Sequence, residues 1–277
     1  MPFVIAVLAA AVLFGTTGTA QALGPGDSTP LGVGAARLVL GGVALAAIGL
    51  GLGLRARRRT AAGTSPRSSG RSLALMTLTG VCLAAYQPLF FVGTERNGVA
   101  VGTVIALGSA PVLAGLLEWL LTRRRPTTAW IIATLVATAG VAVLAFAGGT
   151  AAGADGVGVL GSLGAGASFA VIANAQRRLL SGGWDAFTVT GAMGAVAAVC
   201  GALMLPFTDL TWVGDPGGVA MVTWLGLATV GLAYALFTWG LGGVAAVVGL
   251  LVLGGGLVLL ALTSRARRNP APTPLEV

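Results

Sequence analysis

The sequence predicts an all-α protein, a polytopic bundle of transmembrane helices with about nine spans. Of its 277 residues, 56% are hydrophobic and only 9% are charged, whereas about a quarter of a soluble domain is charged. Apolar runs of about twenty residues recur along the chain. Lipid requires each span to satisfy its own backbone polar groups, and these runs lack the alternation of barrel strands. The spans are therefore expected to be helices.

Nine apolar segments are long enough to cross a hydrocarbon core of about 30 Å. We expect them at residues 3–23, 31–54, 72–93, 99–121, 128–147, 157–180, 186–206, 218–241 and 243–263. The connections are short except for residues 55–71, so no soluble domain is expected. Arginine placement then predicts the orientation, because positive charge favours the cytoplasmic side. Eleven arginines fall in 55–71, 122–127 and 177–185, against only Arg96 in the alternate connections, which predicts a cytoplasmic N-terminus.

The composition also excludes several chemistries. The chain has no histidine, so it offers no imidazole base and no histidine-ligated metal site. Its two cysteines, Cys82 and Cys200, stand alone in apolar segments and form no disulfide or metal pattern. No phosphate-binding Gly-Lys-Ser/Thr motif is present. We therefore expect no enzyme activity, no cofactor and no direct use of ATP.

An internal repeat is suggested by two matches along the chain. The first and sixth segments share three residues at identical spacing, Phe14, Ala20 and Gln21 in one and Phe169, Ala175 and Gln176 in the other. An Ala-Tyr pair recurs in the third and eighth segments, at Tyr86 and Tyr234. Many transporters are built from two inverted halves. We expect residues 1–150 to form a five-helix first repeat and residues 151–277 a second of about four helices.

Four stretches, by their order and spacing, resemble the drug/metabolite transporter superfamily, specifically its EamA-type branch of ten-span exporters. They are Phe14-Gly15-Thr16-Thr17, Pro30 with Arg37, Gly93-Thr94-Glu95-Arg96 leading to Leu107 and Pro111, and the run from Gly226 to Phe237. The resemblance implies an inverted-repeat transporter fold. It also implies a secondary transporter that exports a small metabolite or amino-acid-like compound by alternating access.

Two departures from the family pattern stand out. Leu121-Thr122-Arg123 replaces the family's Leu-Gly-Glu at the end of the fourth span. Gly242-Gly243 passes directly into a glycine-rich segment that looks like the family's tenth span, so we expect the ninth to be absent. An odd number of spans places the C-terminal arginines outside, against the positive-inside preference. The alternative function is therefore a non-transporting remnant that lacks one span.

Polar residues inside the spans are candidates for the substrate site, because they are costly in lipid. The predicted substrate-binding residues are Thr17, Gln21, Arg37, Tyr86, Gln87, Asn174, Trp224 and Tyr234. Arg37 could bind a substrate carboxylate through its guanidinium, or could snorkel outward or pair with Glu95. The hydroxyl and amide groups could line a cavity or only join helices. Glu118 could couple transport to protons, or pair with nearby arginines.

The expected surroundings follow from this interpretation. Partners are a small-molecule substrate and the lipid bilayer, with no nucleic acid, and the chain could be a monomer or a homodimer. The location is a bacterial-type plasma membrane, spanned several times. Trp119, Trp130, Trp184 and Trp212 lie near span ends, as tryptophans that anchor a helix at the membrane interface do.

Overall fold

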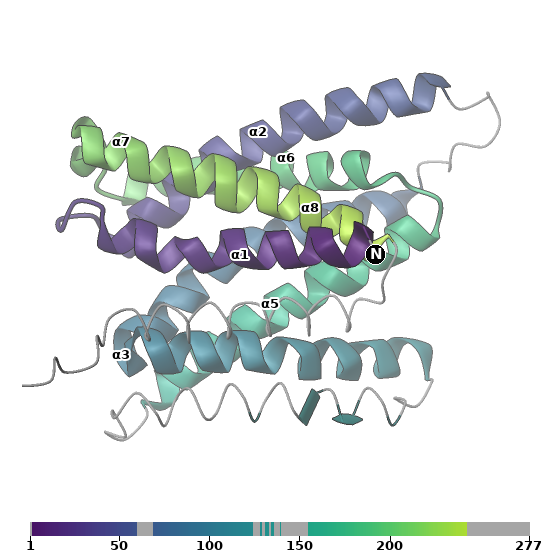
Figure 1. Ribbon diagram of the computed structural model, residues 1–277, viewed down its shortest axis with the longest axis horizontal. Helices are drawn as coiled ribbons and strands as arrows, with labels where there is room; N and C mark the ends of the chain where they lie inside the picture. The colour runs from purple at the N-terminus through teal and green to yellow at the C-terminus, as the bar shows by residue number, and fades with distance from the viewer. Residues whose placement is uncertain are drawn as a thin grey trace, which may run out of the picture.

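In the computed structural model, the described residues are 2–59, 69–123 and 155–242, with a few positions between 128 and 139. Every regular element in this part of the chain is helical. The helices lie side by side along the long axis of the molecule (Figure 1). Seven of them are long and apolar enough to cross a membrane.

The first two helices both begin at proline. α1 spans Pro2–Ala22 and α2 spans Pro30–Arg59. Proline suits a first helical position because its missing N–H would have no partner within the helix. The 30 residues of α2 correspond to about 45 Å at the usual rise of 1.5 Å per residue. The end of α2 extends beyond its neighbours in Figure 1.

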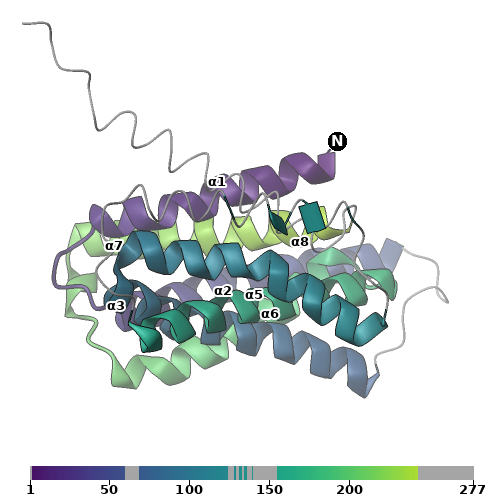
Figure 2. The ribbon, with the colours of Figure 1, turned by 90° about the horizontal axis from the view of Figure 1, so that it is seen from below.

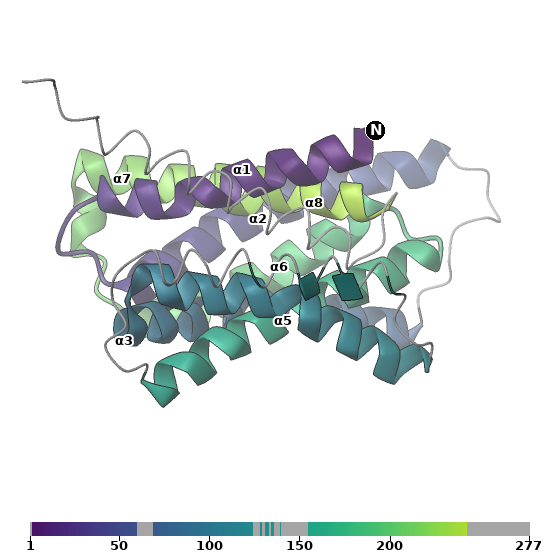
Figure 3. The same cartoon turned by 60° about the horizontal axis from the view of Figure 1, so that its bottom comes forward.

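α3 covers Gly70–Thr122 and consists of two limbs that fold back on each other. The helix breaks at Gly98, whose φ of 77° is a conformation that suits glycine. A Cβ on Gly102 would lie 2.8 Å from the backbone of Gly93, although nine residues of straight helix would separate them by about 13 Å. The two limbs therefore form a hairpin, and Figure 3 shows the bent course of its helices.

Aspartates begin the next two membrane-length helices, α5 (Gly156–Ser181) and α6 (Ala186–Met204). Asp155 accepts hydrogen bonds from the N–H groups of Val157 and Gly158 at 2.7 and 3.1 Å. Asp185 accepts one from the N–H of Thr188 at 2.9 Å. Because the first N–H groups of a helix have no internal partners, these carboxylates stabilise both helix starts.

The last described span changes its helical type midway. After the short turns η1 (Leu205–Phe207) and η2 (Thr211–Gly214), it runs through α7 (Pro216–Thr223), η3 (Trp224–Leu232) and α8 (Ala233–Leu241). η3 is a π-helix of nine residues. Such widened turns are rare and frequently occur at functional sites. The span lies alongside α1 in Figures 1 and 2.

Glycines bring α2 and α6 into close contact along their length. A Cβ added to Gly42 would lie 2.6 Å from the carbonyl oxygen of Gly194, and one added to Gly49 would lie 2.7 Å from the backbone of Gly191. α2 approaches η3 equally closely, since a Cβ on Gly41 would lie 2.5 Å from the Gly226 carbonyl. Small residues at these positions let the helix backbones touch, as is common in membranes.

The seven membrane-length helices coincide with seven of the nine expected segments. The segments expected at 128–147 and 243–263 lie outside the described residues, apart from isolated positions in the first. The four tryptophans expected to anchor the membrane interface differ in their surroundings. Trp119 is 41% exposed, and Trp130 lies outside the described residues. Trp212 is completely buried and packs with Val33, Met221 and Leu225, and Trp184 is 8% exposed. Trp184 and Trp212 are both buried among protein side chains, so for these two residues the expectation was wrong.

Candidate functional site

A cluster of aromatic rings occupies the centre of the bundle, where α1, α3, α5 and α8 meet. Phe14 and Tyr234 are edge to face, with ring centroids 5.0 Å apart. Tyr86 packs against Phe169 at 6.0 Å, and Phe14 and Phe169 meet at 6.2 Å. These edge-on arrangements match the preferred geometry of aromatic pairs. The cluster therefore joins the first and sixth segments to the third and eighth.

Arg37 lies beside this cluster with its charge enclosed. Its side chain is 5% exposed. It is close enough to Tyr86 and Tyr234 to interact electrostatically with both of their hydroxyl groups. Its Nε has no hydrogen-bond acceptor, and no ion pair of Arg37 is found within the described ranges. A guanidinium has five N–H donors and binds carboxylates in a bidentate manner. The arrangement thus presents a buried cation whose donors remain available to an anion.

Gln87 adds a second polar group without partners. It is 1% exposed, and neither its amide nitrogen nor its amide oxygen forms a hydrogen bond. A Cβ added to Gly34 would lie 3.3 Å from the Cβ of Gln87. Gly34 precedes Arg37 by about one turn of α2. Gln87 therefore faces α2 next to the turn that carries Arg37. An unsatisfied buried amide costs roughly 1–3 kcal/mol, a cost that a bound polar ligand would remove.

Four other predicted residues have different surroundings. Asn174 is buried and donates its amide N–H groups to the carbonyl oxygens of Ala114 and Ala170, at 3.1 and 3.0 Å, so it joins α5 to α3. Trp224 is 47% exposed and donates its indole N–H to the hydroxyl of Thr16 at 3.0 Å. Thr17 and Gln21 are partly buried on α1. The structure thus brings Arg37, Tyr86 and Tyr234 together, but attaches Asn174 to helix backbones.

The carboxylates considered near the site do not pair with it. Glu95 is exposed and forms no ion pair with Arg37 in the described structure. Glu118 is also exposed, near the end of α3. Two alternatives to substrate binding were considered for Arg37, namely an outward-pointing side chain and an ion pair with Glu95. The first disagrees with the burial of Arg37, and the second with its lack of an ion pair in the described structure.

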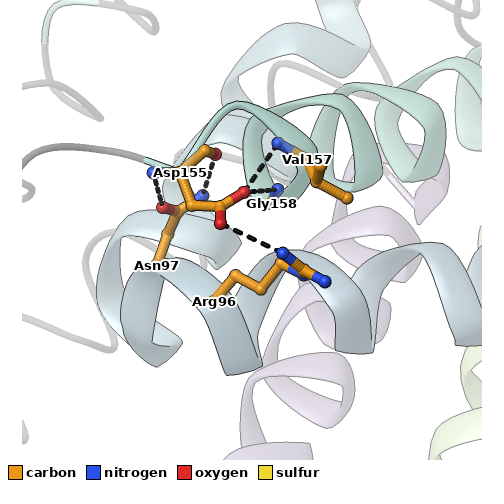
Figure 4. Close-up of polar contacts among 5 residues, drawn as sticks. All are labelled: Arg96, Asn97, Asp155, Val157 and Gly158. Carbon is orange, nitrogen blue, oxygen red and sulfur yellow. Dashed lines mark hydrogen bonds and ion pairs between the residues drawn. The ribbon is translucent and has the colours of Figure 1, made fainter.

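One end of the bundle is held by a polar contact between α3 and α5. Arg96 forms an ion pair with Asp155 at 3.0 Å, and Asn97 accepts from the Asp155 N–H at 2.7 Å and donates to its carbonyl oxygen at 3.2 Å (Figure 4). The backbone N–H of Gly158, followed by Arg96, lowers the pKa of the Asp155 carboxyl. Both groups favour the charged form of the carboxylate.

At the other end, α5 is attached to α8. Arg177 donates a hydrogen bond from Nη1 to the carbonyl oxygen of Leu241 at 2.8 Å. The last carbonyls of a helix have no internal partners and carry partial negative charge. This bond therefore stabilises the end of α8 and connects it to α5.

Sequence reasoning missed part of the central cluster. Phe14 and Phe169 were recognised only as markers of a repeat, and Phe237, which packs against Phe169 at 5.4 Å, was not singled out. Thr238 was also missed, although its buried hydroxyl has no partner and it follows Tyr234 by one turn on the same helix face. The recurrence of Phe14 as Phe169 in the sequence was the available signal, because the rings of these two residues meet in the structure.

The chain matches the model of the EamA-like transporter family over residues 1–146. It is 41% identical over 246 residues to a Bacillus subtilis (strain 168) protein named "Uncharacterized transporter YwfM", an alignment that covers 87% of this chain and 77% of that protein. It is also similar to a solved structure described only as "Crystal structure of protein", with a TM-score of 0.72 and 21% identity, covering 98% of this chain and 90% of the other. That last likeness concerns the fold alone.

Proposed function

This chain belongs to the EamA-like transporter family, and we propose that it is a secondary transporter that exports a small metabolite bearing a carboxylate, such as an amino-acid-like compound. The chain is a multi-pass membrane transporter.

The buried guanidinium of Arg37 carries the proposal about substrate. A charge in this position is expensive unless an anion compensates it, and no described carboxylate does so. A substrate carboxylate would supply that anion. Tyr86, Tyr234 and Gln87 would contribute further hydrogen-bonding groups, and the aromatic rings would contact the apolar part of the substrate.

Alternating access is supported by the way in which the helices pair. α1 packs against α8, and the first limb of α3 packs against α5 through Gly93 and Gly161. α2 packs against η3, and the first limb of α3 packs against α6 through Gly80. Suppose that α1 changes places with α5, α2 with α6, and the first limb of α3 with the last span. Each of these helix pairs then becomes another pair that is also in contact. The same change also exchanges the Phe14–Tyr234 contact with the Phe169–Tyr86 contact, as an inverted repeat requires.

The proposed orientation rests on segregated charge. Arg55, Arg71, Arg177 and Arg178 lie where α2 ends, α3 begins and α5 ends, at the right-hand end of the bundle in Figure 1. The aspartates at 27, 155, 209 and 215 lie at the opposite end. We assign the arginine-rich end to the cytoplasm, with the N-terminus on the same side and nine spans in total. The absence of a nucleotide-binding motif from the sequence favours transport driven by gradients.

Transport by purified protein in liposomes tests the proposal. Liposomes preloaded with a panel of amino acids and small organic acids would be assayed for exchange of labelled substrate. Arg37→Gln should lower the exchange of carboxylate substrates about 10–100-fold, the loss expected for one or two charge-assisted hydrogen bonds. Uncharged amide analogues of the same substrates should be affected far less.

Two comparisons make the result decisive. Arg55→Gln removes the same charge from an exposed position and should leave exchange unchanged. An equal loss for every substrate in the Arg37→Gln variant would indicate a role in folding instead. If the folded wild-type chain exchanges none of the panel, the non-transporting alternative gains support.

A further inference from the structure

A pocket of about 540 Å³ opens between the beginning of α3 and the end of α5. Arg71 and Ser72 line it from α3, Arg178 and Leu179 from α5, and Trp184 from the connection to α6. Its volume lies within the range of about 300–1,000 Å³ that is usual for small-molecule sites. The residues lining the pocket are not members of the central aromatic cluster, and the proposed substrate site does not include them.

The chemistry of the pocket is divided into a cationic rim and an apolar wall. Arg71 and Arg178 provide two positive charges, and neither forms an ion pair in the described ranges. The nearest carboxylate along the chain, Asp185, is already engaged by the N–H and hydroxyl of Thr188. Leu179 and Trp184 belong to an apolar cluster with Met76 and Val189.

The position of the pocket matches the surface of a membrane. Arg71 is the second residue of the span Gly70–Gly98, and Arg178 lies three residues before the end of the span Gly156–Ser181. Both charges thus lie where spans leave the hydrocarbon, at the depth of lipid headgroups. Basic pockets between transmembrane helices are suited to anionic headgroups. Arginine binds phosphate oxygens in a bidentate manner.

We propose that this pocket binds the phosphate of an anionic phospholipid headgroup, with Arg71 and Arg178 contacting the phosphate and the Leu179–Trp184 wall contacting the beginning of an acyl chain. A free phosphate shares the chemistry of the rim but makes no use of the apolar wall. A zwitterionic lipid shares the wall but carries a cationic group that the two arginines repel. An anionic phospholipid satisfies both features.

Native mass spectrometry of the purified full chain would measure the binding. The protein would be titrated with phosphatidylglycerol, with phosphatidylcholine of the same acyl chains and with inorganic phosphate. We expect saturable binding of phosphatidylglycerol to one site, with a preference of tenfold or more over phosphatidylcholine. Each arginine should contribute about tenfold to the affinity, as a charge-assisted contact does, so Arg71→Gln with Arg178→Gln should abolish the preference.

Matched variants and competitors complete the test. Arg55→Gln, at an exposed position on the same end of the bundle, should keep the preference for phosphatidylglycerol. The double substitution of Arg71 and Arg178 by lysine keeps both charges but not the bidentate geometry, and should retain part of the preference even if the glutamine variant misfolds. Inorganic phosphate that displaces the lipid at equal concentration would overturn the lipid assignment. Unchanged binding in the folded glutamine or lysine variant would overturn the site itself.

Discussion

The contact between α2 and α6 provides a quantitative test of the packing. Gly42 lies within this contact, where an added Cβ would be 2.6 Å from the Gly194 carbonyl oxygen and 2.8 Å from the Ala198 nitrogen. Gly51 lies on the same helix, but a Cβ there would meet nothing within 4 Å. Gly42→Ala and Gly51→Ala are therefore the same chemical change at a crowded and an open position.

The expected difference follows from these two positions. Overpacking a close contact costs about 1–3 kcal/mol, because the two backbones must move apart. Both variants share the gain in helix propensity of about 1 kcal/mol from glycine to alanine, so it cancels in the comparison. Gly42→Ala should thus be less stable than Gly51→Ala by about 1–3 kcal/mol, and at roughly 2–4 °C per kcal/mol should unfold at least 2 °C lower.

Thermal unfolding in detergent would measure this difference. The native Cys82 and Cys200 lie within spans, so a thiol-reactive dye reports their exposure as the protein unfolds. Both variants would be compared with the unmodified chain at the same detergent concentration. Equal unfolding temperatures for Gly42→Ala and Gly51→Ala would refute the close approach of α2 and α6.

Two further predictions concern the ends of the bundle. In a cysteine-free background, Gly26→Cys should react with an impermeant thiol reagent in intact cells and Gly70→Cys should not, because the first lies at the proposed external end and the second at the cytoplasmic end. Both glycines have open space for a side chain, and the reverse labelling would contradict the orientation. The pKa of Asp155 is lowered in the folded chain, so its charge stabilises the fold. This stabilisation is complete above the ordinary aspartate pKa of about 3.9, and it is lost as the pH falls through the lower pKa of the folded state. The unfolding temperature of Asp155→Asn should therefore lie below that of the unmodified chain at pH 6 and approach it near pH 3; a constant gap would rule out the carboxylate charge as its cause.

The spans could be predicted from the sequence because crossing a membrane is a local requirement. A helix needs about twenty consecutive apolar residues, and each of the seven membrane-length helices satisfies it within one continuous stretch. The residues that begin or break these helices were identified only in the structure. Asp155 and Asp185 precede their helices directly, and Gly98, where the α3 hairpin turns, lies between two expected spans.

The sequence also identified Arg37, Tyr86 and Tyr234 as unusual residues, but not that they would lie near one another. They come from three helices, and their proximity depends on the rotation of each helix about its axis. Likewise, the hydrogen bonds of Asn174 to two carbonyl oxygens depend on which neighbour α5 packs against. The π-helical turn of η3 had no recognisable signal in the sequence.

The sequence by itself thus determined the helical class, the position of the spans in the described chain and the small set of polar residues inside them. Only the tertiary structure decided which faces of the helices turn inward. Leu38 is completely buried, whereas Leu203, in an equally apolar span, is 68% exposed. Lipid tails are as apolar as a protein interior, so hydropathy does not distinguish a face that meets lipid from one that meets another helix. Close contacts between glycines and hydrogen bonds between helices make that distinction, and both exist only once the helices have packed.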